Sequence, residues 1–330
     1  MTLQRAAAFA PSNIALTKYW GKRDETLNLP LAPSLSVTLS ELGSLTVVQP
    51  QPELTEDVMV LDGQPLDAAG MVKVRRVLDI VRQMAGSQVY AGLQSVNTVA
   101  SARGLASSAS AFGALALAAS KAYGLDLDNA ALSRLARTGS GSAARSISGG
   151  YVLWHAGERA DGLDSYAETF RPADHWPLRV LVAQVRDGKK KVSSTLGMKQ
   201  NRDSPLFAPW IDLCKRDVLT CQEAVAARDM EQLAAVVEGN ALAMHATMMS
   251  SRPALIYWQP ATLAVVHEVR RLRAEGVECC FTIDAGSSVV VLVAEQDARP
   301  VAEALGEIDG IEAVLQTRIG PGARLTEPHG

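Results

Sequence analysis

The sequence has few residues of the kinds that build disulfide frameworks and metal sites. It contains four cysteines, at positions 214, 221, 279 and 280, and none of them forms a Cys-x-x-Cys pair. Its five histidines show no His-Glu-x-x-His spacing. We therefore expect reduced structural thiols and no protein-bound zinc. Cys279 and Cys280 are neighbours, so we expect them to face opposite sides of a strand.

An excess of one charge and long apolar runs are also missing. The net charge of -3 at pH 7 gives no basic surface of the kind that nucleic-acid binding needs. No apolar run approaches the roughly 20 residues of a membrane helix. Residues 1–5 contain no apolar signal core. These absences lead us to expect a cytoplasmic protein with neither nucleic acid nor membrane as partner.

The length of 330 residues predicts two domains of about 150 residues each. Alternating and helical spacing of apolar residues predicts an α+β architecture. Strands are predicted at 7–10, where Pro11 ends the strand, and at 34–39, 45–49, 58–61, 93–96, 151–154, 178–185, 279–283, 289–293 and, as the last, 313–316. Helices are predicted at 71–84, 109–119, 128–138, 207–227, 229–249, 260–275 and after Asp297.

Residues 104–111, Gly-Leu-Ala-Ser-Ser-Ala-Ser-Ala, form a loop that enters a small-residue apolar helix. Gly104 permits a tight turn, and Ser107 or Ser108 is a suitable helix N-cap. The free N–H groups and the helix dipole at such a terminus favour an anion. Two interpretations stay open: a phosphate cradle, or a capped core helix without a ligand.

A second segment, 18–24, concentrates two lysines, an arginine and two aromatic residues. Burying such charges is expensive unless they meet solvent or an anionic ligand. Lys18, Lys22 and Arg23 suit a phosphate or a carboxylate. The alternative is a solvated loop whose aromatic side chains pack on the core.

Two further segments carry polar groups in glycine-rich surroundings. Residues 138–150 form a hydroxyl-rich loop, which is either a flexible linker or a binding loop that uses Arg145. Asp284 ends an apolar strand before a glycine turn, where an Asx turn is the common explanation. Together the segments supply what phosphoryl transfer needs, namely donors for a nucleotide, cations and a carboxylate. The Walker A motif and the protein-kinase motifs are missing.

Four segments in this order resemble the GHMP superfamily of small-molecule kinases, and within it the diphosphomevalonate decarboxylases. They are residues 10–24, 104–109, 140–146 and 284–286, and smaller echoes occur at 192–198 and 245–247. Lys-Tyr-Trp-Gly-Lys-Arg at 18–23 and Ser-Gly-Ser-Ala-x-Arg at 140–145 are typical of the decarboxylases rather than of the whole superfamily.

The resemblance implies a two-domain GHMP-kinase-type fold. An N-terminal, ribosomal-protein-like ATP-binding domain would span 1–178, a ferredoxin-like C-terminal domain would span 179–330, and the active-site cleft would lie between them. The implied reaction is ATP-dependent decarboxylation of mevalonate 5-diphosphate to isopentenyl diphosphate with Mg²⁺, through phosphorylation of the 3-hydroxyl. That step belongs to the mevalonate pathway of isoprenoid biosynthesis. The family resemblance also implies a homodimer.

The resemblance further implies roles for individual residues. Asp284, Lys18 and Arg145 would be catalytic. The substrate would be bound by Tyr19, Lys22, Lys73, Ser140, Ser142 and Arg145. ATP would be bound by Asn97, Gly104, Leu105, Ala106, Ser107, Ser108 and Ser193, and the Mg²⁺ contact would be Ser107 or Ser108.

The chain also departs from the family pattern. Arg103 precedes the cradle, Lys73 stands where an arginine is expected, and Ser287-Ser288 replace Pro-Asn beside Asp284. These departures keep open a phosphomevalonate decarboxylase or a mevalonate 3-kinase. A non-catalytic nucleotide-binding protein is the third alternative, although such a module would not need Asp284.

Overall fold

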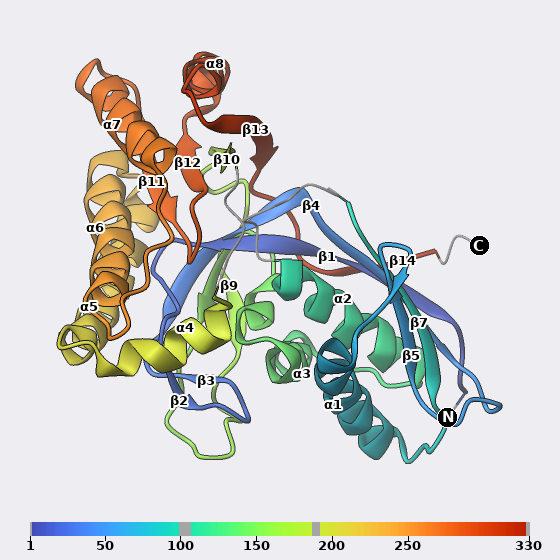
Figure 1. Ribbon diagram of the computed structural model, residues 1–330. Helices are drawn as coiled ribbons and strands as arrows, with labels where there is room; N and C mark the ends of the chain where they lie inside the picture. Colours follow the sequence, from blue (N-terminus) through green and yellow to red (C-terminus); the bar gives the residue numbers. More distant parts are fainter. Residues whose placement is uncertain (1, 99–106, 187–191, 328–330) are drawn as a thin grey trace.

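The computed structural model describes residues 2–98, 107–186 and 192–327. Within them the chain forms an eight-stranded sheet, a four-stranded sheet and a two-stranded ribbon. Figure 1 shows α1, α2 and α3 on one side of β1 and β4, and α5, α6 and α7 as a separate layer. The α+β architecture expected from the sequence is confirmed.

The elements follow the predicted order with some differences in their bounds. The helices are α1 (Ala68–Ala85), α2 (Ser107–Ala122), α3 (Asn129–Gly139), α4 (Ser194–Gln200), α5 (Phe207–Ala227), α6 (Met230–Met249), α7 (Pro260–Ala274) and α8 (Ala298–Gly306), with 3-10 turns η1 (Gly141–Ser146), η2 (Asn201–Asp203) and η3 (Glu295–Asp297). The strands are β1 (Ala6–Ala15), β2 (Lys22–Asp24), β3 (Leu29–Pro30), β4 (Ser34–Pro50), β5 (Val58–Leu61), β6 (Gln64–Pro65), β7 (Ala91–Asn97), β8 (Tyr151–Trp154), β9 (Ala167–Arg171), β10 (Arg179–Val185), β11 (Cys279–Ile283), β12 (Val289–Val293), β13 (Ile311–Arg318) and β14 (Arg324–Thr326).

Two strand predictions near the N-terminus are wrong. Pro11 does not end the first strand, because the pairing of β1 with β4 shifts register between Pro11 and Asn13 and so accommodates a residue without an N–H. The strands predicted at 34–39 and 45–49 are one long β4. A Cβ on Gly43 would collide with the Ala10 carbonyl oxygen, so glycine here allows the two strands to lie close instead of ending one of them.

The eight-stranded sheet has the order β14-β1-β4-β7-β5-β6, and β8 and β9 extend it beside β4. Helices α1, α2 and α3 share one apolar core with this sheet. The small residues of α2 let it lie close to the strands: a Cβ on Gly113 would come within 3.1 Å of Ala10. This close packing fixes the start of α2 beside the strands that carry the site.

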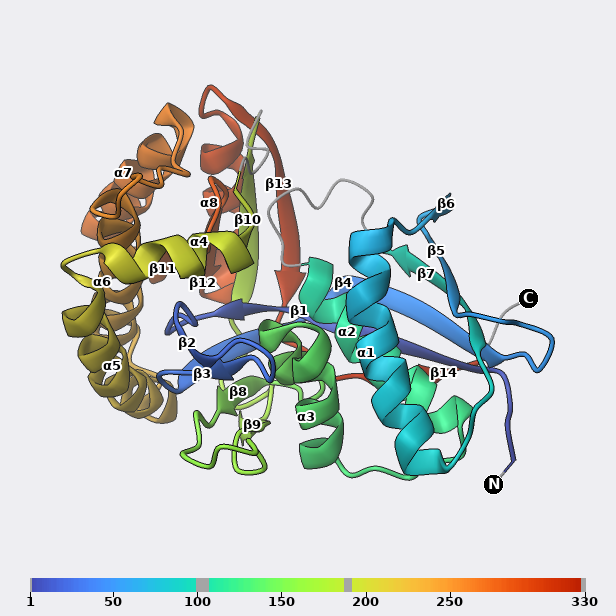
Figure 2. The same ribbon diagram turned by 60° about the horizontal axis from the view of Figure 1, so that its bottom comes forward.

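The four-stranded sheet is antiparallel, in the order β11-β12-β10-β13. Figure 2 shows β10 and β13 upright, with β1 and β4 running across toward them. Cys280 packs in a core with α5, α6 and β4, whereas Cys279 packs in a second core with α7 and α8. The two neighbouring cysteines therefore face opposite sides of β11, as predicted. All four cysteines are free and buried.

The chain does not end in the second sheet. A strand beyond the predicted last one, β14, pairs with β1, with Ala8 opposite Leu325. Between β13 and β14, an isolated β-bridge pairs Ile319 with Leu39 of β4, so the chain returns to the first sheet at this point. The tail thus completes the eight-stranded sheet, and the domain boundary near residue 178 stays a prediction.

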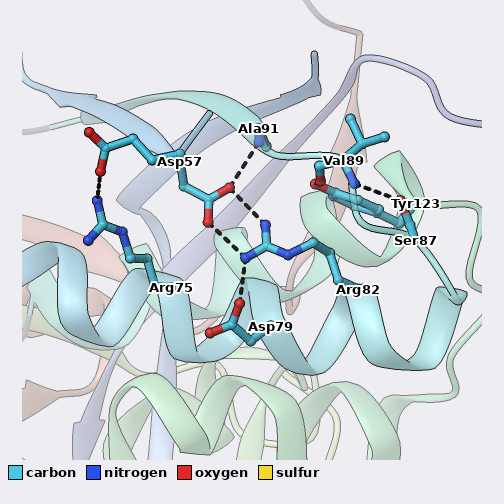
Figure 3. Close-up of polar contacts among 9 residues, drawn as sticks. Asp57, Arg75, Asp79, Arg82, Ser87, Val89, Ala91 and Tyr123 are labelled. Carbon is cyan, nitrogen blue, oxygen red and sulfur yellow. Dashed lines mark hydrogen bonds and ion pairs between the residues drawn. The ribbon is translucent and has the colours of Figure 1, made fainter. Parts of the chain in front are cut away.

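A buried arginine ties α1 to the strands beside it (Figure 3). Arg82 donates to both carboxylate oxygens of Asp57, at 2.8 and 2.9 Å, and to Asp79 at 2.5 Å. The main-chain N–H of Ala91 donates to Asp57 as well, at 2.9 Å. The Asp57 side chain is 1% exposed, whereas the Asp79 side chain is 68% exposed.

This difference in exposure predicts unequal effects of two matching substitutions. Asp57→Asn should lower the free energy of unfolding by about 3 kcal/mol, because it removes the buried member of the two carboxylates that pair with Arg82. Asp79→Asn, at the exposed partner of the same arginine, should change it by less than about 1 kcal/mol. Urea denaturation of both variants measures the difference. Equal losses would contradict the account.

Candidate active site

The central feature of the candidate site is an ion pair that joins the two sheets. Lys18 follows β1, and Asp284 follows β11, 266 positions later in the chain. The Lys18 Nζ donates to Asp284 Oδ1 at 2.6 Å and to the Ala15 carbonyl at 2.9 Å. The Lys18 side chain is 2% exposed and the Asp284 side chain 28% exposed. The fold therefore presents a carboxylate to solvent with a buried ammonium group behind it.

Arg145 lies close enough to this pair for its charge to act on it. Burial lowers the pKa of Lys18, the Asp284 carboxylate opposes that shift, and the Arg145 charge adds to it. Burial also lowers the pKa of Arg145 to about 10, against the opposing effect of Asp284. Arg145 stays charged at neutral pH, and its charge acts on both members of the Lys18–Asp284 pair.

The segment that carries Arg145 is not a flexible linker. Residues Gly141–Ser146 form the 3-10 turn η1, most of which is buried. The Arg145 Nε donates to Asn13 Oδ1 at 3.0 Å, and its Nη1 donates to Ser34 Oγ at 2.9 Å. Its guanidinium lies 5.6 Å from the centre of the Trp154 ring. These contacts hold the guanidinium in one orientation, and they support the binding-loop interpretation.

Sequence reasoning assigned no role to Asn13 or Ser34. Besides accepting from Arg145, Asn13 donates through Nδ2 to the Ser142 carbonyl at 3.1 Å and to Ser146 Oγ at 2.8 Å. Asn13 is 1% exposed. Asn13 lies in β1 beyond Pro11, where the predicted strand ends, so no local signal marked it as a buried polar group that needs partners.

The two serine segments meet in the structure. Ser108 Oγ lies 3.4 Å from Ser140 Oγ, which in turn lies 3.4 Å from Ser142 Oγ. Since α2 begins at Ser107, Ser108 belongs to its first turn and does not cap it. The predicted contacts at Gly104, Leu105 and Ala106 lie outside the described residues, as does the side chain of Ser107.

Tyr19 presents a hydroxyl group beside these serines. Its ring packs edge-on against Trp154, with ring centres 4.7 Å apart. A Cβ on Gly141 would collide with its hydroxyl oxygen, so the two residues touch. Among the described residues this buried hydroxyl has no hydrogen-bond partner. Burial raises the pKa of Tyr19, so the group stays a neutral donor.

Four cationic side chains lie close enough to act on one another around Lys22. Burial lowers the pKa of Lys22, and the charges of Lys73, Arg76 and Arg202 lower it further, while Glu25 opposes them. Lys73 is exposed on α1. Arg76 was missed, although it follows Lys73 by three positions on that helix and so shares its face. The Lys22 Nζ is held at 2.6 Å by Asn28 Oδ1.

Three other predicted ligands have structural contacts. Arg23 donates to the carbonyls of Arg159 and Ala156. These contacts with the main chain favour a structural role for its side chain. Asn97 binds both carboxylate oxygens of Asp62 and accepts from Ser44. Ser193 caps α4 and accepts from the Leu196 N–H at 3.3 Å. Roles for Asn97 and Ser193 in ATP binding stay predictions.

A histidine on α6 lies behind the aspartate. His245 Nε2 is 3.2 Å from the Asp284 carbonyl oxygen, and the residue is 1% exposed. Burial, together with the positive charge of Lys18, lowers the pKa of His245 to about 3. The imidazole is therefore neutral at physiological pH. The sequence segment 245–247 resembled the family pattern but carried no assigned role.

This low pKa predicts an acid-dependent loss of stability. Below pH 6.5, the ordinary value for histidine, the unfolded chain binds a proton at His245 that the folded chain refuses until the pH approaches about 3. The free energy of unfolding should therefore fall by about 1.4 kcal/mol per pH unit below that value. Between about pH 7.5 and about pH 5.5 the wild type should lose about 1.4 kcal/mol more than His245→Gln in urea denaturation. Equal losses would show that His245 does not resist protonation.

In the part of the chain that the structure describes, no helix is long and apolar enough to cross a membrane. Within the same residues, no three His, Cys, Asp or Glu side chains are grouped as metal ligands.

Comparison with known proteins identifies the family of this chain. The family described as diphosphomevalonate decarboxylase-like N-terminal domain matches residues 10–167, and the mevalonate 5-diphosphate decarboxylase C-terminal domain matches residues 180–322. A diphosphomevalonate decarboxylase of Aspergillus fumigatus is 37% identical over 94% of this chain and 81% of its own length.

Solved structures extend the likeness to three dimensions. One, described as MDDEF in complex with MVAPP, AMPPCP and magnesium, is 40% identical, with a TM-score of 0.92 over 99% of this chain and 100% of its own. Mevalonate diphosphate decarboxylase from Staphylococcus aureus is 36% identical, with a TM-score of 0.91 over 99% of both chains. The expected two-domain fold is thereby confirmed. The chain belongs to the diphosphomevalonate decarboxylase family.

Proposed function

We infer that this protein catalyses the ATP-dependent decarboxylation of mevalonate 5-diphosphate to isopentenyl diphosphate, ADP, phosphate and CO₂. The observation that carries this conclusion is the Lys18–Asp284 pair at 2.6 Å with the charged Arg145 beside it. A kinase site needs the carboxylate and a cation. The guanidinium of Arg145 is additional to these two groups, and its fixed orientation suits a substrate that also carries a carboxylate.

The reaction has two parts, and Asp284 acts in the first. The γ-phosphoryl group moves from ATP to the 3-oxygen, and the hydroxyl proton leaves toward Asp284. Phosphoryl transfer has a loose transition state, so orienting the hydroxyl matters more than strong basicity. Lys18 supports the charge of Asp284 and offsets negative charge on the transferring group.

Arg145 acts in the second part. The C3–O bond breaks and phosphate leaves with its electron pair; the bond to the carboxylate carbon then supplies the electrons of the new double bond, and CO₂ leaves. The planar guanidinium holds the carboxylate in line for this cleavage. Asn13 and Ser34 fix the plane of the guanidinium and are positioning residues.

The substrate diphosphate fits a part of the site that offers hydroxyl groups and positive charges. The hydroxyl groups are those of Tyr19, Ser140 and Ser142. The positive charges are those of Lys22 and Lys73. Arg76 adds the two-pronged donor that Lys73 lacks. The mutual repulsion of these cations before binding favours an anionic ligand.

ATP is assigned to the start of α2. The Ser108 hydroxyl lies 3.4 Å from Ser140 Oγ, so ATP phosphates at α2 would adjoin the substrate. Helix N-termini attract phosphates. Mg²⁺ fits as an ion carried by ATP, with Ser107 or Ser108 as the protein contact, and when bound it neutralises phosphate charge. A solved structure of a similar protein holds AMPPCP and magnesium, which supports ATP and Mg²⁺ as the cofactors.

The contact between Tyr19 and Gly141 yields a prediction about substrate binding. Gly141→Ala places a Cβ against the Tyr19 hydroxyl and displaces it. We expect KM for mevalonate 5-diphosphate to rise at least about tenfold, the cost of one displaced hydrogen bond to a charged group, while KM for ATP changes by less than about twofold. Steady-state kinetics with each substrate varied in turn measures both constants. Gly239→Ala, whose Cβ would meet nothing within 4 Å, is the matched control.

A comparison of three substrates tests the function itself. Purified protein with Mg-ATP is given mevalonate, its 5-phosphate or its 5-diphosphate, and kcat/KM is measured for ADP and CO₂ release. CO₂ release with preference for the diphosphate supports the proposal. Preference for the 5-phosphate identifies a phosphomevalonate decarboxylase, and ADP without CO₂ identifies a 3-kinase. No turnover with any of them leaves a nucleotide-binding protein.

Two further expectations from the family resemblance stay predictions. One is a homodimer, which sedimentation of the purified protein tests. The other is a cytoplasmic location, which fractionation of the source cells tests.

A further inference from the structure

The turn that carries Asp284 is short and lies between two buried strands. Residues 284–288 connect β11 to β12, and Ser287 and Ser288 are 3% and 9% exposed. A turn of this length with a glycine at its centre has several backbone conformations available. Inside the turn, the Gly286 N–H donates to the Asp284 carbonyl at 2.6 Å, and two helices outside the turn make further contacts with its ends.

At its first residue, the turn is held by α6. The Asp284 carbonyl lies 3.2 Å from His245 Nε2. A carbonyl oxygen only accepts, so Nε2 carries the proton of the neutral ring. The ring is itself fixed, since it packs on Trp258 with ring centres 4.8 Å apart. His245 thus offers a rigid hydrogen-bond donor to the backbone of Asp284, whose side chain pairs with Lys18.

At its far end, the turn is held by α7. The Thr262 hydroxyl donates to the Ser287 carbonyl at 2.7 Å and accepts from the Gln259 N–H at 3.0 Å. Thr262 is fully buried. The same hydroxyl therefore completes the start of α7 and fastens the Ser287-Ser288 pair that replaces the family's Pro-Asn. A proline would fix the backbone by its ring, whereas a serine needs an external contact.

We propose that His245 and Thr262 are positioning residues that hold the two ends of the Asp284 turn, and so keep the Asp284 carboxylate against Lys18. The inference rests on the proposed function, because it assigns a purpose to the geometry of Asp284. A displacement of about 1 Å at a reacting group costs up to about a hundredfold in rate. Neither side chain touches the substrate; each acts through the backbone of the turn.

The test uses two pairs of matched variants of the full chain. His245→Asn removes the donor at the Nε2 position, and His245→Gln restores an N–H near that position. Thr262→Val removes the hydroxyl at nearly constant volume, and Thr262→Ser restores it. We expect the Asn and Val variants to lose about 10- to 100-fold in kcat while KM for both substrates stays within about twofold. We expect the Gln and Ser variants to recover most of kcat.

Several results would overturn the proposal. They are kcat within twofold of wild type in the Asn and Val variants, or a rise in both KM values that matches the loss of kcat, or no recovery by Gln and Ser. Crystal structures of the variants provide a readout besides activity, because the Lys18–Asp284 separation of 2.6 Å should lengthen in the Asn and Val variants only. If His245→Asn does not fold, the threonine pair decides. An inactive wild type would instead contradict the proposed function, and the crystallographic comparison would still decide this inference.

Discussion

Asp284→Asn lowers kcat by about 10²- to 10⁴-fold, the range by which a positioned acid–base group accelerates a reaction. Asparagine keeps the shape of the side chain and loses its charge. It no longer accepts the proton of the 3-hydroxyl, and it leaves the Lys18 ammonium, 2% exposed, without its carboxylate. Mg-ATP should still bind within about twofold of wild-type affinity, since its phosphates are assigned to the start of α2.

Turnover and equilibrium binding of Mg-ATP together measure this prediction. Asp309→Asn, the same change at an exposed residue of the C-terminal half, is the control and should leave both quantities unchanged. Activity within tenfold of wild type in Asp284→Asn would remove Asp284 from the chemistry. Loss of ATP binding with turnover would show that the residue supports the nucleotide instead.

Arg145→Gln lowers kcat/KM for mevalonate 5-diphosphate by about a thousandfold. Removing the charged member of a buried pair costs several kcal/mol, and about 4 kcal/mol corresponds to that factor. The substrate carboxylate then lacks its two-pronged donor. Asn13 and Ser34 also lose the group that they orient.

Steady-state kinetics at saturating ATP, with a thermal unfolding scan of the same preparation, measures the effect. Arg299→Gln is the control, because the Arg299 side chain is 87% exposed on α8. A cooperative unfolding transition in Arg145→Gln shows that the loss is functional. Disappearance of that transition would make Arg145 a structural residue.

Local sequence signals were sufficient for much of the fold. The strands at 279–283 and 289–293 have the predicted bounds, because each is a predominantly apolar run, with Thr282 the one polar residue, that ends at polar or turn residues. Helix α3 begins at Asn129, one residue after the predicted start, and the Asp128 side chain caps it. Where the sequence carried a breaker such as Pro11, the strand continued, since a partner strand accommodated it through a register shift.

The sequence predicted the reactive residues of the candidate site but not the residues that orient them. Lys18, Arg145 and Asp284 carry chemistry in their side chains, and their surrounding motifs are distinctive. The groups that orient them are ordinary polar residues, such as Asn13 and His245. Their partners lie 132 and 39 positions away in the chain, so only the folded structure joins them. The absence of local signal is expected for contacts of this range.

The most direct test of the account is the stoichiometry of one reaction. Wild-type protein is mixed with Mg-ATP and mevalonate 5-diphosphate labelled in the carboxyl carbon, and ADP, phosphate, CO₂ and isopentenyl diphosphate are counted over the same interval. The pairing of Asp284 and Lys18 with the oriented Arg145 predicts equal amounts of all four. ADP formed in excess of CO₂, with a phosphorylated and still carboxylated product, would contradict it.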